Sequence, residues 1–435
     1  MSDHKTKCVI VSILLVFIAF YFICMTTSCT KNEPPLRIGA LLPLTGSGKY
    51  AGEEVRDGLL MAAEEINEQG GINGHKIEIV VKNALSSDGK ISDSSAEQLF
   101  EELDSDNPLI TVSCLSFISM KFAPLADAKQ RLLVGLVATV PELTQNREWV
   151  YRYWPTAFHE APPMADIFLK IGKDRNAVSA NINADVESKL NVDVANQEDV
   201  QSKLNVDVVN QEDVQPKLNV DIVNQADEKS DYNGVLGIIY MDDAYGSSVF
   251  TDLVKRSKQE NIETVASAFP SDSKDFFKNV NDVKDSDAVA VIGFDFHIIN
   301  ILKALRAIKY KGEIISTTTA TLPSVTSIQE SDGVYVTAPA IYNKNYRFAD
   351  SVKRRYEEKY GKPFTQYSAN GYDFIKILIG LLEDKPLNQE SVKAIFDKGF
   401  VYSGVFGNIE LKKGSQDILF PLFPAQIKRG EIIYR

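Results

Sequence analysis

The sequence has little of the chemistry that most enzymes and nucleic-acid-binding proteins need. Its 435 residues include four histidines, and none of them is spaced as a metal-ligand pair. No Gly-x-Ser-x-Gly or Gly-x-Gly-x-x-Gly motif occurs, and the paired acids Glu53-Glu54 and Glu64-Glu65 are interpreted as solvated faces of a helix. The net charge is -12, and the sequence has no cluster of basic residues of the kind that binds nucleic acid. We therefore expect no catalytic residues, no metal, no cofactor and no nucleic-acid partner.

Cysteine is also scarce, which excludes a disulfide framework. Two of the four cysteines lie in an apolar run near the N-terminus, and Cys29 follows that run. Only Cys114 is left in the predicted globular part, so it has no intrachain partner there. We interpret Cys114 as a small buried residue, with a nucleophilic role as the alternative.

The first 28 residues are typical of a lipoprotein signal peptide. Two lysines precede the apolar run Cys8–Met25, and small residues separate that run from Cys29. The run approaches the length of a membrane span, so an uncleaved anchor is the alternative. The residues before Cys29 resemble a bacterial lipobox, with Thr26 where that motif has leucine. A lipid on Cys29 would hold the protein outside the cytoplasm on a bacterial membrane.

Strand and helix patterns alternate along the chain in two series. Apolar runs such as Leu36–Leu42 are followed by apolar residues at helical spacing, and Gly70-Gly71 end the first such helix. The alternation restarts at Gly234. We predict an α/β protein with two doubly wound parallel-sheet lobes, whose ligand lies beyond the carboxyl ends of the strands.

A 14-residue sequence is repeated three times between the two series. The copies fill residues 188–229, where four lysines face nine acidic residues. We interpret 181–230 as a solvated insertion in the second lobe, because the copies have few apolar residues and no aromatics. A small stacked repeat structure or an adhesive surface is the alternative. We place no binding site there.

Several short phrases occur in an order and spacing that are specific when taken together. They are Arg37-Ile-Gly-Ala-Leu-Leu-Pro-Leu-Thr-Gly46, Gly52-Glu-Glu-Val-Arg-Asp-Gly58, Ala63-Glu-Glu-Ile-Asn-Glu-Gln-Gly-Gly-Ile-Asn-Gly74, Thr139-Val-Pro-Glu-Leu-Thr144, Asp242-Asp-Ala-Tyr-Gly246 and Tyr356-Glu-Glu-Lys-Tyr-Gly361. With them, the chain from Leu36 to Arg435 apart from the repeat resembles the branched-chain amino-acid-binding family. Members of that family are type I periplasmic solute-binding proteins of ABC transporters.

The resemblance implies that three crossovers join the lobes, as a three-strand hinge, near Tyr153, Pro339 and Ser403. Lobe 1 would then comprise residues 37–153 and 339–402, and lobe 2 residues 154–338 and 403–435. We expect a monomer that closes on its solute by hinge motion and docks on an ABC permease.

Two strand-end loops of the first lobe are predicted to bind an anionic group. The loop Ser113–Ser116 follows a strand and precedes a helix, where a hydroxyl and helix N–H groups can bind a carboxylate. Thr139 lies in a similar loop. By resemblance, Ser116, Ala138 and Thr139 match positions that hold the α-carboxylate of the ligand. Helix capping is the alternative role of the hydroxyls.

Aromatic residues are expected to cover the solute. By resemblance, Tyr245 matches the tyrosine of an Asp-x-x-Tyr-Gly loop in the second lobe, and Tyr50 matches an aromatic residue at the cleft mouth. A tyrosine provides an apolar face and one hydroxyl, which suits this role. Packing in the first turn of a helix is the alternative for Tyr50.

The sequence departs from the family where an acidic residue binds the ligand's ammonium. After the strand near Ile314 it reads Ser316-Thr-Thr-Thr-Ala320, without a carboxylate. A buried ammonium without a counter-charge is costly, so another acid serves or the ligand has no amine. Asp295, in another strand-end loop, is the candidate acid, with a helix cap as its alternative role.

These observations predict an extracytoplasmic lipoprotein that binds a small polar solute, such as an amino acid or a related compound, for an ABC transporter. A sensory or scaffold lipoprotein of the same fold, which binds a ligand or a cell-envelope partner without transport, is the alternative.

Overall fold

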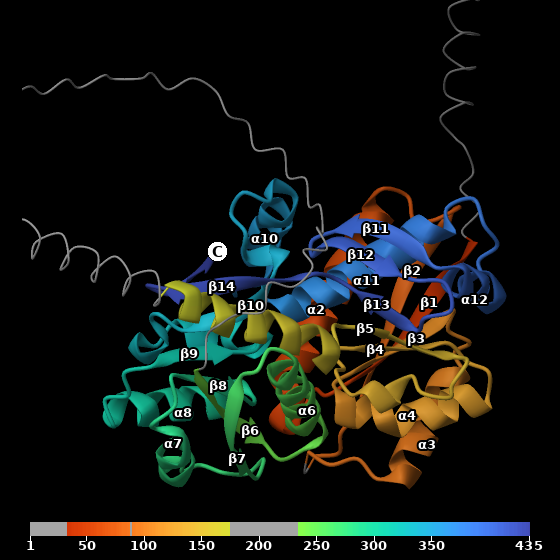
Figure 1. Ribbon diagram of the computed structural model, residues 1–435. Helices are drawn as coiled ribbons and strands as arrows, with labels where there is room; N and C mark the ends of the chain where they lie inside the picture. The colour runs from red at the N-terminus through yellow and green to blue at the C-terminus, as the bar shows by residue number, and fades with distance from the viewer. Residues whose placement is uncertain (1–32, 88, 175–233) are drawn as a thin grey trace, which may run out of the picture. The chain divides into compact units, whose positions relative to one another are not determined.

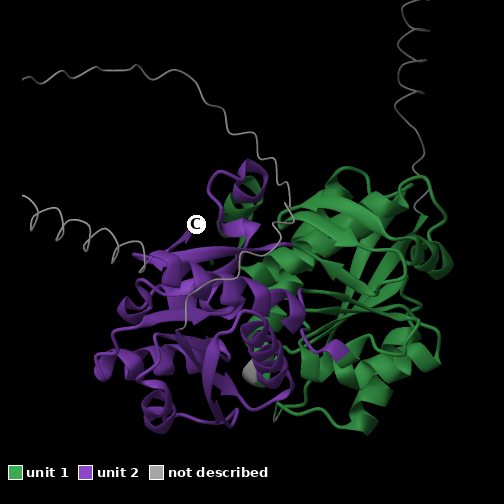
Figure 2. Cartoon of the chain, viewed as in Figure 1, with its two compact units in different colours: residues 1–138, 142–154, 351–420 green, residues 139–141, 155–350, 421–435 purple. Residues whose placement is uncertain are grey.

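The computed structural model describes residues 33–87, 89–174 and 234–435, and the chain divides into two compact units (Figures 1 and 2). The predicted signal peptide with Cys29 and the predicted repeat insertion lie outside the described residues. Among the residues described, no helix is both long and apolar enough to cross a membrane. Unit 1 comprises the described residues up to Ala138 together with Glu142–Trp154 and Ser351–Phe420. Unit 2 comprises Thr139–Pro141, the described residues from Pro155 to Asp350, and Pro421–Arg435.

Unit 1 is built on an eight-stranded sheet in the order β11-β12-β13-β5-β4-β3-β1-β2. The strands from β13 to β2 run parallel, while β11 and β12 join them by antiparallel pairing. The bounds are β1 (Glu33–Leu42), β2 (His75–Asn83), β3 (Ile110–Cys114), β4 (Leu133–Leu136), β5 (Val150–Tyr153), β11 (Phe400–Gly404), β12 (Gly407–Leu411) and β13 (Asp417–Leu419).

The helices of unit 1 pack closely because glycines line one crossing. A Cβ atom on Gly58 of α2 would lie 2.0 Å from the carbonyl oxygen of Ser368 in α11, so a side chain is excluded there. Gly70 and Gly71 follow α2 with φ values of 108° and 82°, as its predicted end requires. The helices are α2 (Lys49–Glu68), α3 (Asp93–Asp104), α4 (Ser116–Ala128), α10 (Arg347–Tyr360, which begins in unit 2), α11 (Gln366–Leu382) and α12 (Gln389–Lys398).

Unit 2 is built on a seven-stranded sheet in the order β15-β14-β10-β9-β8-β6-β7. Strands β6 to β10 run parallel, and β14 and β15 are antiparallel additions. Residues 157–174 are helical. The other bounds are β6 (Val235–Met241), α6 (Ala244–Gln259), β7 (Glu263–Phe269), α7 (Phe277–Val283), β8 (Ala288–Ile292), α8 (Asp295–Ala307), β9 (Glu313–Ser316), α9 (Pro323–Thr326), β10 (Tyr335–Pro339), β14 (Leu422–Lys428) and β15 (Glu431–Tyr434).

The predicted fold class is confirmed: both units are doubly wound α/β structures with mainly parallel sheets. All five residues of β8 are buried, as expected for a parallel strand covered on both faces. Helix α6 starts at Ala244 because the Asp243 side chain accepts a hydrogen bond from Gly246 N at 2.8 Å and caps the first turn.

The unit boundaries differ from the crossovers placed near Pro339 and Ser403. Residues 403–420 belong to unit 1, because β11, β12 and β13 extend its sheet from β5. Residues 340–350 stay with unit 2. The first crossover, near Tyr153, lies next to the boundary after Trp154.

Candidate functional site

The predicted anion-binding residues follow two neighbouring strands of unit 1. Ser116 is the first residue of α4, two positions beyond β3, and is partly exposed. Ala138 is buried two positions beyond β4. Cys114 pairs with Leu136 at the ends of these strands, so the structure brings the two loops together. Thr139 follows Ala138 and is partly exposed.

Both loops contain a residue with an unfavourable backbone conformation. Leu115, directly before Ser116, has a φ of 71°, and Val137, directly before Ala138, has a φ of 52°. Positive φ is uncommon for residues other than glycine and unusual for a β-branched residue. Such conformations cost about 1 to 3 kcal/mol each and cluster at functional sites. Leu115 and Val137 have this conformation at two neighbouring strand ends, and eight other described residues besides glycine have positive φ elsewhere.

Tyr50 lies in the first turn of α2, and its side chain is 45% exposed. Its ring packs edge to face against Tyr367, with ring centroids 6.3 Å apart. Tyr367 in turn lies 6.1 Å from Trp154. Tyr50 thus has both a packing contact and an exposed face, and unit 1 carries an aromatic series from its surface to Trp154.

The strand ends of unit 2 hold a buried polar cluster. Tyr245, in the first turn of α6, is only 7% exposed. Its hydroxyl donates to Thr317 Oγ1 at 3.0 Å and lies 3.4 Å from Glu160 Oε2. Its ring stacks on Phe294, with centroids 6.2 Å apart. The ring of Tyr245 thus contacts an aromatic residue, and its hydroxyl contacts polar side chains, beyond the carboxyl ends of the strands.

Asp295 is the first residue of α8 and is partly exposed. Its Oδ2 accepts a hydrogen bond from Ser324 Oγ at 2.8 Å, and its Oδ1 accepts one from Phe296 N at 2.9 Å. A carboxylate in the first turn also interacts favourably with the helix dipole. These contacts give Asp295 a structural role at the start of the helix.

The sequence reasoning missed Glu160, which contacts the loop that lacks an acid. Glu160 is 1% exposed, in the helix of residues 157–174. Its Oε1 accepts hydrogen bonds from Thr318 Oγ1 at 2.5 Å and from Thr318 N at 3.3 Å. Burial raises the pKa of its carboxyl group. A sequence signal existed: Glu160 interrupts an apolar helical stripe that includes Ala157, Ala161 and Met164.

The interpretation of Glu54 as part of a solvated face is wrong. Glu54 is 1% exposed, and its Oε1 lies 2.7 Å from Lys362 Nζ. The same ammonium lies 2.7 Å from Asp57 Oδ2. No local pattern reveals this pairing, because Lys362 is more than 300 residues away in sequence. These ion pairs have a structural role, because they join α2 to the segment between α10 and α11.

Neither a metal site nor a reactive thiol is found in the residues described. Within 33–87, 89–174 and 234–435, no group of three or more histidine, cysteine or acidic side chains is placed to hold a metal ion. Cys114 is buried at the end of β3, and burial raises the pKa of its thiol. A protonated, buried thiol is a poor nucleophile.

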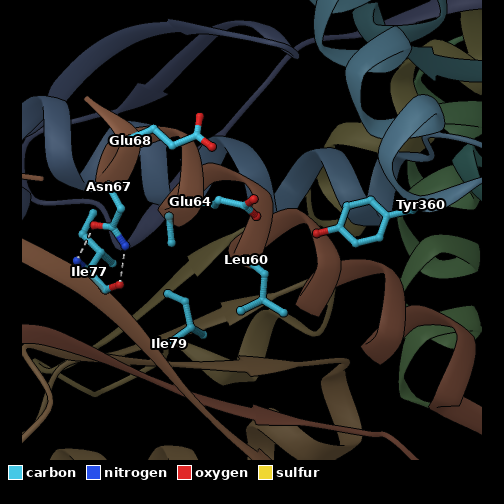
Figure 3. Close-up of a pocket in the computed structure, with 8 residues that line it drawn as sticks. Leu60, Glu64, Asn67, Glu68, Ile77, Ile79 and Tyr360 are labelled. Carbon is cyan, nitrogen blue, oxygen red and sulfur yellow. Dashed lines mark hydrogen bonds between the residues drawn. The ribbon is translucent and has the colours of Figure 1, made fainter. Parts of the chain in front are cut away.

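A surface pocket of about 510 Å³ lies between α2 and the edge strand β2 of unit 1 (Figure 3). Asn67 accepts a hydrogen bond from Ile77 N at 2.7 Å and donates one to Ile77 O at 2.8 Å, so its side chain covers part of the sheet edge. The pocket contains none of the predicted site residues. It is lined by Leu60, Ala63, Glu64, Asn67, Glu68, Ile77, Ile79 and Tyr360.

Comparisons with known proteins agree on one family. Residues 35–228 and 223–431 match the family model described as "Periplasmic binding protein". Over 160 residues the chain is 26% identical to Leu/Ile/Val-binding protein homolog 8 of Brucella suis biovar 1 (strain 1330). That stretch covers 34% of this chain and 38% of the relative's own length.

Two solved structures have a similar fold. A leucine-binding protein from Thermotoga maritima MSB8 matches with a TM-score of 0.67 and 17% identity, covering 92% of this chain and 97% of that one. A solute-binding protein of an ABC transporter from Rhodopseudomonas palustris BisB5, in complex with 3,4-dihydroxybenzoic acid, matches with a TM-score of 0.68 and 16% identity, covering 92% and 95%. The fold therefore accommodates ligands of different chemistry.

Proposed function

Because this chain belongs to the periplasmic binding protein family, we propose that it captures a small polar solute for an ABC transporter by closing its two units on that solute. The solute is an amino acid or a related compound. The observation that carries the proposal is the pair of strained residues, Leu115 and Val137, each directly before a residue predicted to bind the ligand. Strain at strand ends is typical of binding loops that are fixed in advance.

Each unit contributes one set of contacts in this proposal. In unit 1, Ser116 binds a carboxylate of the solute through its hydroxyl and N–H groups at the start of α4. Ala138 and Thr139 contact the same carboxylate from the loop beyond β4. Tyr50 presents its exposed ring to the solute. In unit 2, Tyr245 covers the solute, and the sequence-based candidate for the acid is Asp295. Solute bound by both sets favours the closed state, because only that state has all the contacts.

The location of the protein is the second part of the proposal. A lipid on Cys29 would hold a monomer on the outer side of a bacterial membrane, beside the permease that it supplies. The family supports an extracytoplasmic location, and the lipobox-like residues before Cys29 support the anchor. We expect the wild type to incorporate radiolabelled palmitate and Cys29→Ser to incorporate none. A wild-type protein without the label would contradict the lipid anchor.

The function is tested by thermal unfolding of the purified protein with a panel of amino acids, short peptides, amides and carboxylates. A ligand of the native state at 100 times its dissociation constant adds about 2.7 kcal/mol of stability. For a unit of this size we expect that ligand to raise the melting temperature by about 5 to 10 °C. No shift across the panel would contradict solute capture and favour the sensory or scaffold alternative.

A further inference from the structure

We propose that Glu160 is the acid that binds a cationic group of the solute, so that the solute is an amine rather than a simple carboxylate. The inference rests on the proposed function, because it assigns a role at the strand ends of unit 2. It follows from the position of Glu160, from the groups around it and from the charge that its surroundings leave uncompensated.

Glu160 lies where a ligand of a parallel sheet binds. Tyr245 follows β6 and Thr318 follows β9, and both are in contact with the Glu160 carboxylate. Strands β6 and β9 flank β8 in the sheet and run parallel to it, so their carboxyl ends lie on the same side of the sheet. Ligands of such sheets bind beyond the carboxyl ends of the strands. Glu160 therefore supplies a carboxylate to the Ser316–Ala320 loop, which has none of its own.

The two oxygens of Glu160 are not equally satisfied. Oε1 accepts two hydrogen bonds from Thr318, through its hydroxyl and its backbone N–H. Oε2 has the 3.4 Å contact with the Tyr245 hydroxyl, whose shorter hydrogen bond, 3.0 Å, goes to Thr317. A carboxylate oxygen accepts two hydrogen bonds readily, so Oε2 has capacity for a strong donor.

No cation of the described chain compensates Glu160. Its pKa is affected by burial and by neutral donors, with no contribution from a charged neighbour in the parts of the chain that are described. Glu54, which is equally buried, pairs with Lys362, and Asp417 pairs with the buried Arg152. Burial of a carboxylate without a counter-charge is unfavourable, and an incoming ammonium removes that cost. Glu160 is therefore suited to a ligand cation rather than to a second carboxylate.

Matched pairs of solutes test the inference by calorimetric titration of the wild-type protein. Each pair consists of an L-amino acid and the same skeleton without the amine: leucine with 4-methylpentanoate, phenylalanine with 3-phenylpropanoate, and glutamate with glutarate. Benzoate is added as a single carboxylate without an amine. In at least one pair we expect the amine to bind at least about 100-fold more tightly, because the other member leaves the buried acid unpaired.

Glu160→Gln keeps the shape of the side chain and an oxygen for Thr318, but it removes the negative charge. We expect it to weaken binding of the amine by about 30-fold or more and to change binding of its partner by less than about threefold. The matched control is Asp166→Asn in the same helix, because Asp166 is 56% exposed and pairs with Arg256 at the surface. We expect the control to bind as the wild type does.

Three results would overturn the inference. If the wild type binds the amine-free member of each pair as tightly as the amine, the solute is a carboxylate and the proposed function stands without the inference. This comparison needs no variant, so it decides the matter even if Glu160→Gln does not fold. Loss of amine binding in Asp295→Asn but not in Glu160→Gln would assign the role to Asp295. No binding by any probe would remove the proposed function and the inference together.

Discussion

The side chain of Asn370 holds the backbone of Val137 in its strained conformation. Asn370 Oδ1 accepts a hydrogen bond from Val137 N at 3.2 Å, and Asn370 Nδ2 donates one to Tyr153 O at 3.0 Å. All three groups are buried in unit 1. The φ of 52° at Val137 would relax more easily without this bond. A residue of α11 thus stabilises the backbone conformation of the loop that contains Ala138.

We expect Asn370→Ala to lower both stability and solute affinity. The substitution leaves the N–H of Val137 and the carbonyl of Tyr153 buried without partners, at a cost of about 2 to 3 kcal/mol in the free energy of unfolding. Urea unfolding followed by the fluorescence of Trp149 and Trp154 measures this cost, since both tryptophans of the chain lie in unit 1. The control is Gln98→Ala, which removes an exposed hydrogen bond to Glu102. Equal effects of the two substitutions would contradict the assigned role.

The hydroxyls of Ser116 and Thr139 are expected to act in binding and not in folding. Each of Ser116→Ala and Thr139→Ala should weaken binding of the solute identified by the panel by about tenfold, because one hydrogen bond to a charged group is lost. The melting temperature of the free protein should stay within about 2 °C of the wild type. Ser94→Ala, at an exposed serine in α3, is the control. Unchanged affinity in both variants would show that these loops do not contact the solute.

Lys362 is expected to be important for stability. Lys362→Met leaves Glu54 and Asp57 without their shared ammonium, and removal of one partner of a buried ion pair typically costs 3 to 5 kcal/mol. Because Lys362 is 31% exposed and Arg56 also pairs with Asp57, we expect about 2 kcal/mol in urea unfolding.

The matched control for Lys362 is Lys359→Met. Lys359 pairs with Glu64, whose side chain is 54% exposed, and surface pairs of this kind contribute less than about 1 kcal/mol. A similar small loss in both variants would mean that solvent compensates the charges of Glu54 and Asp57.

Asp373 is expected to make stability depend on pH. Burial raises its pKa to about 7, although its carboxylate accepts hydrogen bonds from Val405 N and Phe406 N. The folded state therefore keeps a proton that the unfolded state releases above a pH of about 4. This contribution to stability is fully present below pH 4 and is lost as the pH rises to about 7, at no more than about 1.4 kcal/mol per pH unit.

The measurement is urea unfolding between pH 5 and pH 8 for the wild type and for Asp373→Asn. The variant starts from a lower stability, because an amide nitrogen cannot accept from Phe406 N. Its stability should depend less steeply on pH between 5 and 7 than that of the wild type. Parallel pH profiles would show that Asp373 is ionised in the folded protein over this range.

The local sequence predicted the two alternating series of strands and helices because it contains the information that they need. Apolar runs of strand length, helical spacing and glycines such as Gly70 and Gly71 act within a few residues. The C-terminal strands were not predicted, since β11 and β12 pair with each other and extend a sheet formed much earlier in the chain. That pairing is why the last unit boundary lies at Phe420 rather than near Ser403.

The sequence by itself determined the α/β class, the two alternating series and the residues at the strand ends, because periodicity and turn residues are local properties. The tertiary structure decided which charges are buried and what each one meets. Glu54 and Glu160 both lie on amphipathic helices, yet one pairs with Lys362 and the other meets Thr318 and Tyr245 without a cation among the described residues. Such partners come together only when distant segments pack, so no local pattern distinguishes them.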